Sequence, residues 1–98
     1  LLPICDYGES NYWLSCARLT EGTAKMPLDI ILALEAENIE ARPIWKPMHM
    51  QKLFENSKSI LNGVSEELFS KGLCLASSTT MTKNDVKMIC EIIKKNLA

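Results

Sequence analysis

Residues 38–51, NIEARPIWKPMHMQ, restrict what this chain can fold into more than any other stretch. Pro43 and Pro47 each lack a backbone N–H, and each drives the residue before it toward extended geometry. A regular helix is therefore excluded, and we expect an open, stiff, extended loop over residues 42–48. Such a loop displays side chains suited to an anion or a flat ring, namely Arg42, Trp45, Lys46 and His49.

The composition is that of an ordinary globular domain. Hydrophobic residues make up 47% and charged residues 23% of the 98 residues, which argues against disorder and favours one domain. Eleven basic and twelve acidic residues give a net charge of −1, so nothing supports a nucleic-acid partner or a membrane-surface role. No apolar run approaches the roughly 18 residues of a membrane span. The chain opens without a signal peptide or a methionine, which suggests a piece of a longer protein.

The four cysteines indicate a reducing compartment. They are Cys5, Cys16, Cys74 and Cys90, with no C-x-x-C pair, and the chain has one histidine, so we expect no metal site. Each cysteine lies in an apolar run, where a buried free thiol behaves as a small hydrophobic side chain. Free thiols in the cytoplasm are therefore favoured over two disulfides, although an even count leaves disulfides open.

The first half of the chain predicts strand, helix and strand. Residues 1–5 suit a sheet edge or the remnant of an earlier element. Residues 11–19 are apolar on both alternating faces, which predicts a buried, central strand with Tyr12 and Trp13 in the core. A helix begins at Pro27, buries Ile30, Ile31 and Leu34, and ends at Asn38 as a left-handed cap. A short strand over residues 39–42 then leads into the proline loop.

The second half predicts helix, strand and helix. A connector over residues 51–63 contains one helical turn, and a short helix capped by Ser65 ends at Gly72. A brief buried strand follows at residues 73–76, and Thr82 caps the last helix. The predicted apolar stripe of that helix is Val86, Ile89, Cys90, Ile93 and Leu97. The fold class is α+β, with a small antiparallel or mixed sheet and helices packed mainly on one face.

Each residue of the proline loop also has a simpler interpretation. His49 is an acid/base or phosphate contact, or a surface residue. Lys46 is a phosphate contact or Schiff-base lysine, or a solvated lysine, and Arg42 clamps an anion or pairs with a nearby acid. Trp45 stacks on a ring or packs over the sheet edge. The residues alone complete no catalytic constellation, since glycine-rich phosphate loops and nucleophile elbows are missing.

Four segments are similar, in this order, to the C-terminal part of the DegT/DnrJ/EryC1/StrS aminotransferases. They are SNYWLSC (10–16), NIEARPIWKPMHMQ (38–51), VSEELFSKGLCLASST (64–79) and TKNDVKMICEIIKKNL (82–97). The family's aromatic-x-Pro-x-His pattern is matched by Trp45, Pro47 and His49. The fuller form RP-x-W-K-P-M-H resembles the branch that acts on UDP-linked 4-keto-6-deoxy sugars, the N-acetylbacillosamine type. One departure is LCLASS at residues 73–78, where the family reads close to L-C-L-P-S-G.

The resemblance implies that residues 1–98 are the small C-terminal domain of a fold type I, pyridoxal-phosphate-dependent transferase. The large cofactor-binding domain, with its cofactor lysine, is then absent from this chain, so Lys46 does not fill that role and the fragment is inactive alone. The implied substrate-binding residues are Arg42, Trp45, Lys46 and His49, with Asn11 and Tyr12 at the start of the first strand.

The resemblance further implies amination of a nucleotide-linked keto sugar for cell-surface polysaccharide or glycan biosynthesis. Glutamate is the expected amino donor, and a homodimer the expected full-length assembly. Two alternatives stay open. One is a freestanding small-molecule-binding or regulatory α+β module. The other is a relative that uses the cofactor for dehydration, because fold alone does not determine function.

Overall fold

The computed structural model describes residues 6–97, so the sheet edge expected at residues 1–5 lies outside the described part. Eight short elements follow one another along the chain. They are β1 (Ser15–Arg18), α1 (Pro27–Glu35), β2 (Arg42–Pro43), the 3-10 turns η1 (Met48–Met50) and η2 (Lys52–Phe54), α2 (Val64–Lys71), β3 (Gly72–Leu75) and α3 (Lys83–Leu97).

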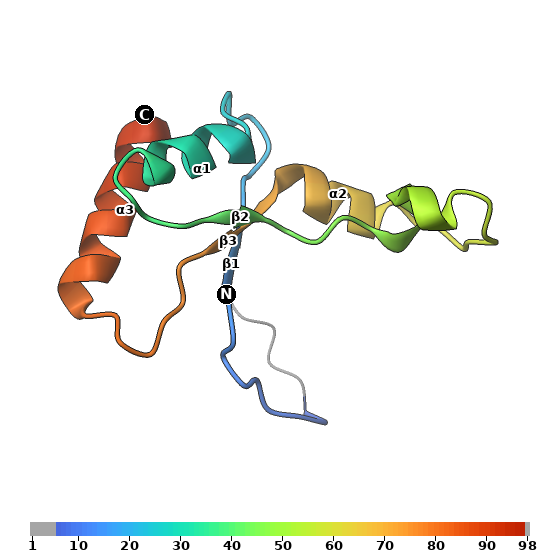
Figure 1. The fold of residues 1–98 in the computed structure, drawn as a ribbon, viewed down its shortest axis with the longest axis horizontal. Coiled ribbons are helices and arrows are strands. Elements are labelled where there is room, and N and C mark those ends of the chain that lie inside the picture. Colours follow the sequence, from blue (N-terminus) through green and yellow to red (C-terminus); the bar gives the residue numbers. More distant parts are fainter. Residues whose placement is uncertain (1–5, 98) are drawn as a thin grey trace.

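The strands form one antiparallel sheet in the order β1-β3-β2, so the last strand in sequence lies in the centre (Figure 1). Helices α1 and α3 lie together on one side of the strands, whereas α2 extends to the other side. The α+β class with a small antiparallel sheet is therefore confirmed.

The core lies where α1, α3 and β3 meet. Its buried members are Ile30, Leu34, Leu73 and Ile89. Leu34 is fully buried and Leu73 is 2% exposed, so one helix and the central strand supply the best-protected side chains. Ile30 and Leu34 confirm the predicted apolar face of the first helix, and Ile31 packs beside them, partly buried.

The turn after α1 is the one that the sequence predicts. Asn38 adopts a left-handed φ of 59°, a conformation that asparagine tolerates better than most residues. The Asn38 N–H donates to the Glu35 carbonyl at 2.9 Å, and the Ile39 N–H donates to the Leu34 carbonyl at 3.0 Å. These two bonds are those of a Schellman motif, and Ile39 packs against the core beyond it.

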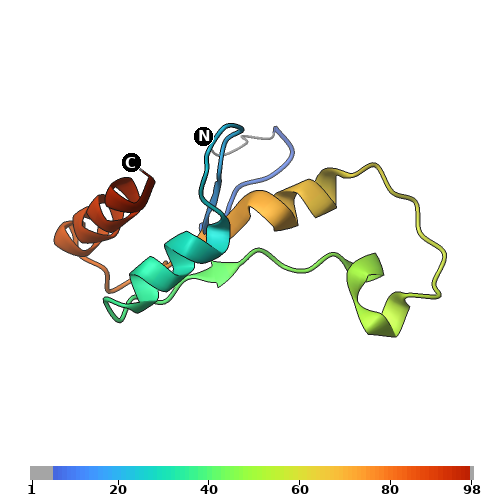
Figure 2. The same cartoon turned by 90° about the horizontal axis from the view of Figure 1, so that it is seen from above.

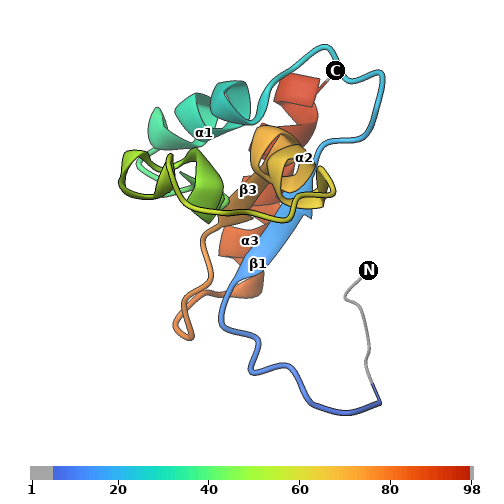
Figure 3. The same cartoon turned by 90° about the vertical axis from the view of Figure 1, so that its right-hand side faces the viewer.

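The prediction of a buried, central strand over residues 11–19 is wrong. Only Ser15–Arg18 form a strand, all four residues are exposed, and β1 lies at the sheet edge. Upstream, the Asn11 side-chain oxygen accepts the Trp13 N–H at 3.1 Å, and Tyr12 has a φ of 51°. Side chains that bond the neighbouring backbone in this way compete with strand pairing. Figure 3 shows the resulting irregular segment before β1.

The predicted cap of the second helix is also wrong. The helix begins at Val64, and the residue before it is Gly63, with a left-handed φ of 81°. The Val64 N–H is satisfied by the Asn62 side-chain oxygen at 3.2 Å. The Ser65 hydroxyl instead donates to the Glu66 carboxylate at 3.1 Å, so it caps no backbone group. Gly72 does end the helix as expected.

The last helix buries only part of the predicted stripe, at Ile89 and Ile93. Ile89 is buried, and Ile92 and Ile93 pack against the core. Val86 and Leu97 are 49% and 41% exposed, and Cys90 is exposed. A helical period shows that one face is apolar, but the neighbouring elements determine which part of it is covered.

Alanine in place of Thr82 is expected to lower the free energy of unfolding by about 1 kcal/mol, as for loss of an N-cap. The capping box predicted here is present. The Thr82 N–H donates to the Asp85 carboxylate at 2.7 Å, and the Asp85 N–H donates to the Thr82 hydroxyl at 3.3 Å. Urea denaturation measures the loss, and Thr79→Ala in the preceding exposed turn is the control that should change little.

The same capping box predicts a pH dependence. Hydrogen bonds from the Thr82 backbone N–H and then its hydroxyl hold the pKa of Asp85 below its ordinary 3.8. A carboxyl group whose pKa is lower in the folded than in the unfolded state stabilises the fold above its unfolded pKa. That contribution is lost as the pH falls through the lower, folded value.

No helix within residues 6–97 is both long and apolar enough to cross a membrane.

Candidate functional site

The proline loop begins a long excursion from the sheet, which we call the arm and define as residues 44–63. Figure 2 shows the arm leaving β2, passing through its short helical turns and returning to α2. Residues 44–47 are free of helix and strand, and η1 begins at Met48, directly after Pro47. The extended loop expected over residues 42–48 is therefore shorter, since its first two residues pair in β2 and Met48 begins η1. The helical turn expected in the connector is present as η2.

His49 lies on η1, the first helical turn of the arm. Its Nε2 is 2.9 Å from Oε1 of Glu66, and the two side chains are 20% and 32% exposed. Glu66 stands in the first turn of α2. Its own backbone N–H is the largest cause that holds the pKa of the Glu66 carboxyl below its ordinary value. Desolvation opposes this shift, and Ser65 and then His49 add to it. The contact joins the proline loop to α2 and holds the imidazole ring in one orientation.

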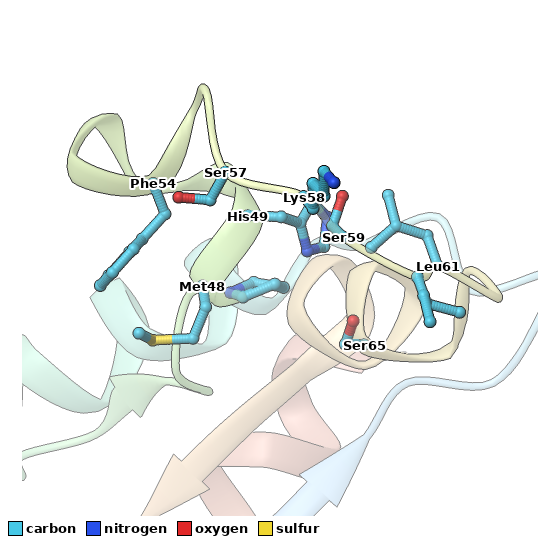
Figure 4. Close-up of a pocket in the computed structure, with 10 residues that line it drawn as sticks. Met48, His49, Phe54, Ser57, Lys58, Ser59, Leu61 and Ser65 are labelled. Carbon is cyan, nitrogen blue, oxygen red and sulfur yellow. The ribbon is translucent and has the colours of Figure 1, made fainter.

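A cavity of about 450 Å³ opens beside His49. Its wall comes from both ends of the arm and from the start of α2 (Figure 4). The lining combines apolar and polar side chains: Pro47, Met48, His49, Phe54, Ser57, Lys58, Ser59, Ile60, Leu61 and Ser65. One cation, several hydroxyls and one imidazole beside apolar walls are suited to a polar ligand with an anionic part.

Arg42 does not reach this cavity. Its Nε donates to Oε1 of Glu40 at 2.6 Å, so the simpler interpretation, pairing with a nearby acid, is the one observed. Arg42 instead borders a second cavity of about 460 Å³, between the end of α1 and β2. Both side chains of this ion pair are exposed, so the guanidinium is accessible from solvent. Exposed pairs contribute little stability, so this one can open at little cost.

Lys46 is exposed on the extended part of the arm. Within residues 6–97, no carboxylate forms an ion pair with it, while its carbonyl accepts a hydrogen bond from the Gln51 side chain at 3.0 Å. A lysine that bonds a cofactor needs a desolvated position, and Lys46 has none. This residue therefore suits a phosphate contact and does not suit covalent cofactor chemistry.

Trp45 connects the arm to the segment before β1. Its ring centroid is 5.7 Å from that of Trp13, at an interplanar angle of 40°, and the two residues are 60% and 66% exposed. The prediction that Tyr12 and Trp13 lie in the core is therefore wrong, because Tyr12 is 77% exposed as well. Asn11 and Tyr12 directly precede Trp13, so they belong to the segment that contacts the arm through this ring pair.

The hydroxyls of the 77–80 loop are engaged within the protein. Ser77 accepts the Ser15 N–H at 2.8 Å and donates to the Leu75 carbonyl, and the Ser78 and Thr80 hydroxyls are 2.8 Å apart. The contacts occupy three of the four hydroxyls of this loop, those of Ser77, Ser78 and Thr80, so they leave little of the loop to hold a phosphate.

Two contacts of the site were not foreseen from the sequence. Glu66 carries no signal of a contact with the proline loop, and the apolar pattern of residues 11–19 predicts Trp13 in the core. No local pattern links Glu66 to His49, because the arm between them determines their approach. One residue in the sequence does indicate that Trp13 lies outside a regular strand. Asn11, two residues before it, is a turn-forming residue.

Comparison with known proteins agrees with the resemblance. The model of the DegT/DnrJ/EryC1/StrS aminotransferase family matches residues 4–94. EpsN of Bacillus subtilis (strain 168), named as a pyridoxal phosphate-dependent aminotransferase, is 41% identical over 96 residues, or 94% of this chain. The GDP-perosamine synthase of Caulobacter vibrioides is 27% identical over 82 residues, or 84% of this chain. The chain spans 24% and 22% of the lengths of these two relatives.

Proposed function

Because this chain belongs to the DegT/DnrJ/EryC1/StrS aminotransferase family, we propose that it is the C-terminal domain of a pyridoxal-phosphate-dependent sugar aminotransferase. The full protein aminates a nucleotide-linked keto sugar for cell-surface polysaccharide or glycan biosynthesis. The observation that carries the proposal is the family match over residues 4–94, which includes the whole proline loop. The names of the two relatives support the same chemistry.

The cofactor belongs to a part of the protein outside these 98 residues. When bound, pyridoxal phosphate supplies the electron sink of the amino transfer. Neither lysine near the candidate site suits a covalent bond to the cofactor. Lys46 is exposed, and Lys58 lines the cavity from an exposed position. The task left to this domain is to bind and orient the sugar nucleotide.

The arm is the part of the domain that would meet the substrate. Lys46 and His49 contact phosphate or sugar oxygens, and Arg42 joins them if its exposed pair with Glu40 opens. Trp45 packs against the flat or apolar part of the ligand, with Asn11 and Tyr12 close by. Glu66 keeps the His49 ring in place while the ligand binds.

The remaining parts of the proposal concern the whole enzyme. Glutamate donates the amino group, and the full-length protein is a homodimer. The location is the cytoplasm, which agrees with the free thiols of Cys16, Cys74 and Cys90.

A visible absorbance spectrum of the full-length protein with pyridoxal phosphate tests the enzyme assignment. We expect an absorbance band that borohydride traps on one lysine outside residues 1–98. A flat spectrum would contradict the aminotransferase assignment and leave the binding-module alternative.

Amination of a UDP-linked 4-keto-6-deoxy sugar with glutamate as amino donor then tests the substrate class. Dehydration of that sugar would instead identify the alternative in which the cofactor serves dehydration.

Alanine in place of His49 is expected to lower kcat/KM for that sugar nucleotide about ten- to a hundredfold. A hydrogen bond to a charged group contributes about 1.5–3 kcal/mol, which corresponds to this factor. Affinity for pyridoxal phosphate should not change, because the cofactor is held elsewhere. Steady-state kinetics and a cofactor titration measure the two effects.

Lys52→Ala is the matched control for this variant. Lys52 is exposed on η2, on the same arm, and lines neither cavity. The control should keep both constants. Equal losses of sugar-nucleotide use and cofactor affinity in His49→Ala would contradict the assignment of the arm to the substrate.

A further inference from the structure

Two cysteines face each other across neighbouring strands of the sheet. Cys16 of β1 and Cys74 of β3 are partners in the antiparallel register. Their sulfur atoms are 3.6 Å apart, and both thiols are free. The proposed binding of cofactor and substrate involves neither residue, so the pair is open to another interpretation.

The strand register is compatible with a disulfide between the two residues. Directly opposite residues of an antiparallel pair have Cα atoms about 4.5 or 5.5 Å apart. Disulfide-bonded residues have Cα atoms about 4.4–6.8 Å apart, so both spacings are permitted. The sulfur atoms, 3.6 Å apart, need to approach by only about 1.5 Å to reach the S–S bond length of about 2.05 Å.

The two thiols differ in exposure and in chemistry. Cys16 is exposed on the edge strand, whereas Cys74 is 7% exposed in the central strand. Burial, and then the contact with Cys16, raises the pKa of the Cys74 thiol to about 11. A dissolved oxidant therefore meets Cys16 first, while Cys74 stays protonated beside it.

We propose that Cys16 and Cys74 are a reversible redox pair that a hydroperoxide converts into a cross-strand disulfide. The Cys16 sulfur attacks the peroxide, and the O–O bond breaks to give a sulfenic acid and one molecule of water or alcohol. The Cys74 sulfur then attacks the Cys16 sulfur, the S–O bond breaks, and the hydroxyl group leaves with the Cys74 proton as water. Both sulfurs are oxidised, the peroxide is reduced, and a thiol reductant reverses the change.

The disulfide would fasten the sheet at the point where the arm begins. Cys74 is also the register partner of Arg42 in β2, so Cys16, Cys74 and Arg42 lie in one row across the sheet. Beside this row, β1 is held by the Ser15 N–H to Ser77 bond. Oxidation would join the exposed edge strand β1 covalently to the central strand β3. Because β1 begins two residues after Trp13, the bond would also restrain the segment that contacts Trp45 of the arm.

The test is peptide mapping of the full-length protein after treatment with hydrogen peroxide under native conditions. Trypsin with a glutamate-specific protease cuts after Glu9, Arg18, Lys71 and Lys83. These cuts place Cys16 and Cys74 on separate peptides, free of Cys5 and Cys90. Without reduction, we expect one linked peptide pair, lighter than the two thiol peptides by two hydrogen atoms. Dithiothreitol should separate it.

Variants make the assignment specific. Cys16→Ser and Cys74→Ser should each abolish the linked pair, while Cys90→Ser, at an exposed thiol on α3, should retain it. Oxidised protein should also melt at a higher temperature than reduced protein, and Cys16→Ser should remove that difference. Since Cys16 is exposed, this variant keeps the test valid if Cys74→Ser misfolds.

Two results would overturn the proposal. One is Cys16 ending as a sulfinic or sulfonic acid in native protein without any linked peptide. The other is the same linked peptide forming equally well in denatured protein, since the strand register would then have no part in it.

Discussion

Replacing Gly72 by alanine is expected to lower the free energy of unfolding by about 3 kcal/mol, at the upper end of the usual cost of overpacking. Gly72 ends α2 and begins the central strand β3. A Cβ atom built there would collide with the Leu68 carbonyl oxygen and with the end of the Ile44 side chain. The side chain can move aside, but a backbone carbonyl of α2 cannot move without shifting the helix against the strand.

Urea denaturation of the chain and of its Gly72→Ala variant measures this effect. Gly22→Ala is the control, because Gly22 has a left-handed φ of 84° but open space where the Cβ would stand. Its expected cost is about 1–2 kcal/mol, from backbone conformation alone. A Gly72→Ala variant as stable as the parent would mean that the junction of α2 and β3 is looser than described.

Replacing Ile89 by alanine is expected to lower the free energy of unfolding by about 2–5 kcal/mol, since it removes buried methyl groups and leaves a cavity. Ile89 is 6% exposed and packs in the core with Leu34 and Leu73. Val86, one turn earlier in α3, is 49% exposed. Val86→Ala is therefore the matched control, with an expected change within about 0.5 kcal/mol, as for surface substitutions.

The two variants together test the orientation of α3. The apolar period of the sequence places both residues on one stripe, whereas the structure buries only Ile89. Equal losses in this 98-residue chain would show that Val86 is also covered and that the helix is rotated from the orientation described here.

Much of the candidate site was predictable because it lies within one short segment. Two prolines determine the extended loop, and the family pattern marks His49, which the structure places beside a cavity. The contact between His49 and Glu66 was not predictable, because the two residues belong to different elements. The pairing of Arg42 with Glu40 was foreseen as an alternative, since those residues are close neighbours in the chain.

The sequence by itself determined the features that arise within four or five residues. These are the helix start at Pro27, the left-handed turn at Asn38 and the capping box of Thr82 and Asp85. Each depends on backbone hydrogen bonds and allowed dihedral angles of adjacent residues.

Only the tertiary structure decided which surfaces are covered. It placed β3 rather than β1 at the centre of the sheet, buried Ile89 but exposed Val86, and set Cys16 opposite Cys74. Apolar composition shows that a segment favours burial. Which other elements pack against that segment depends on the path of the whole chain.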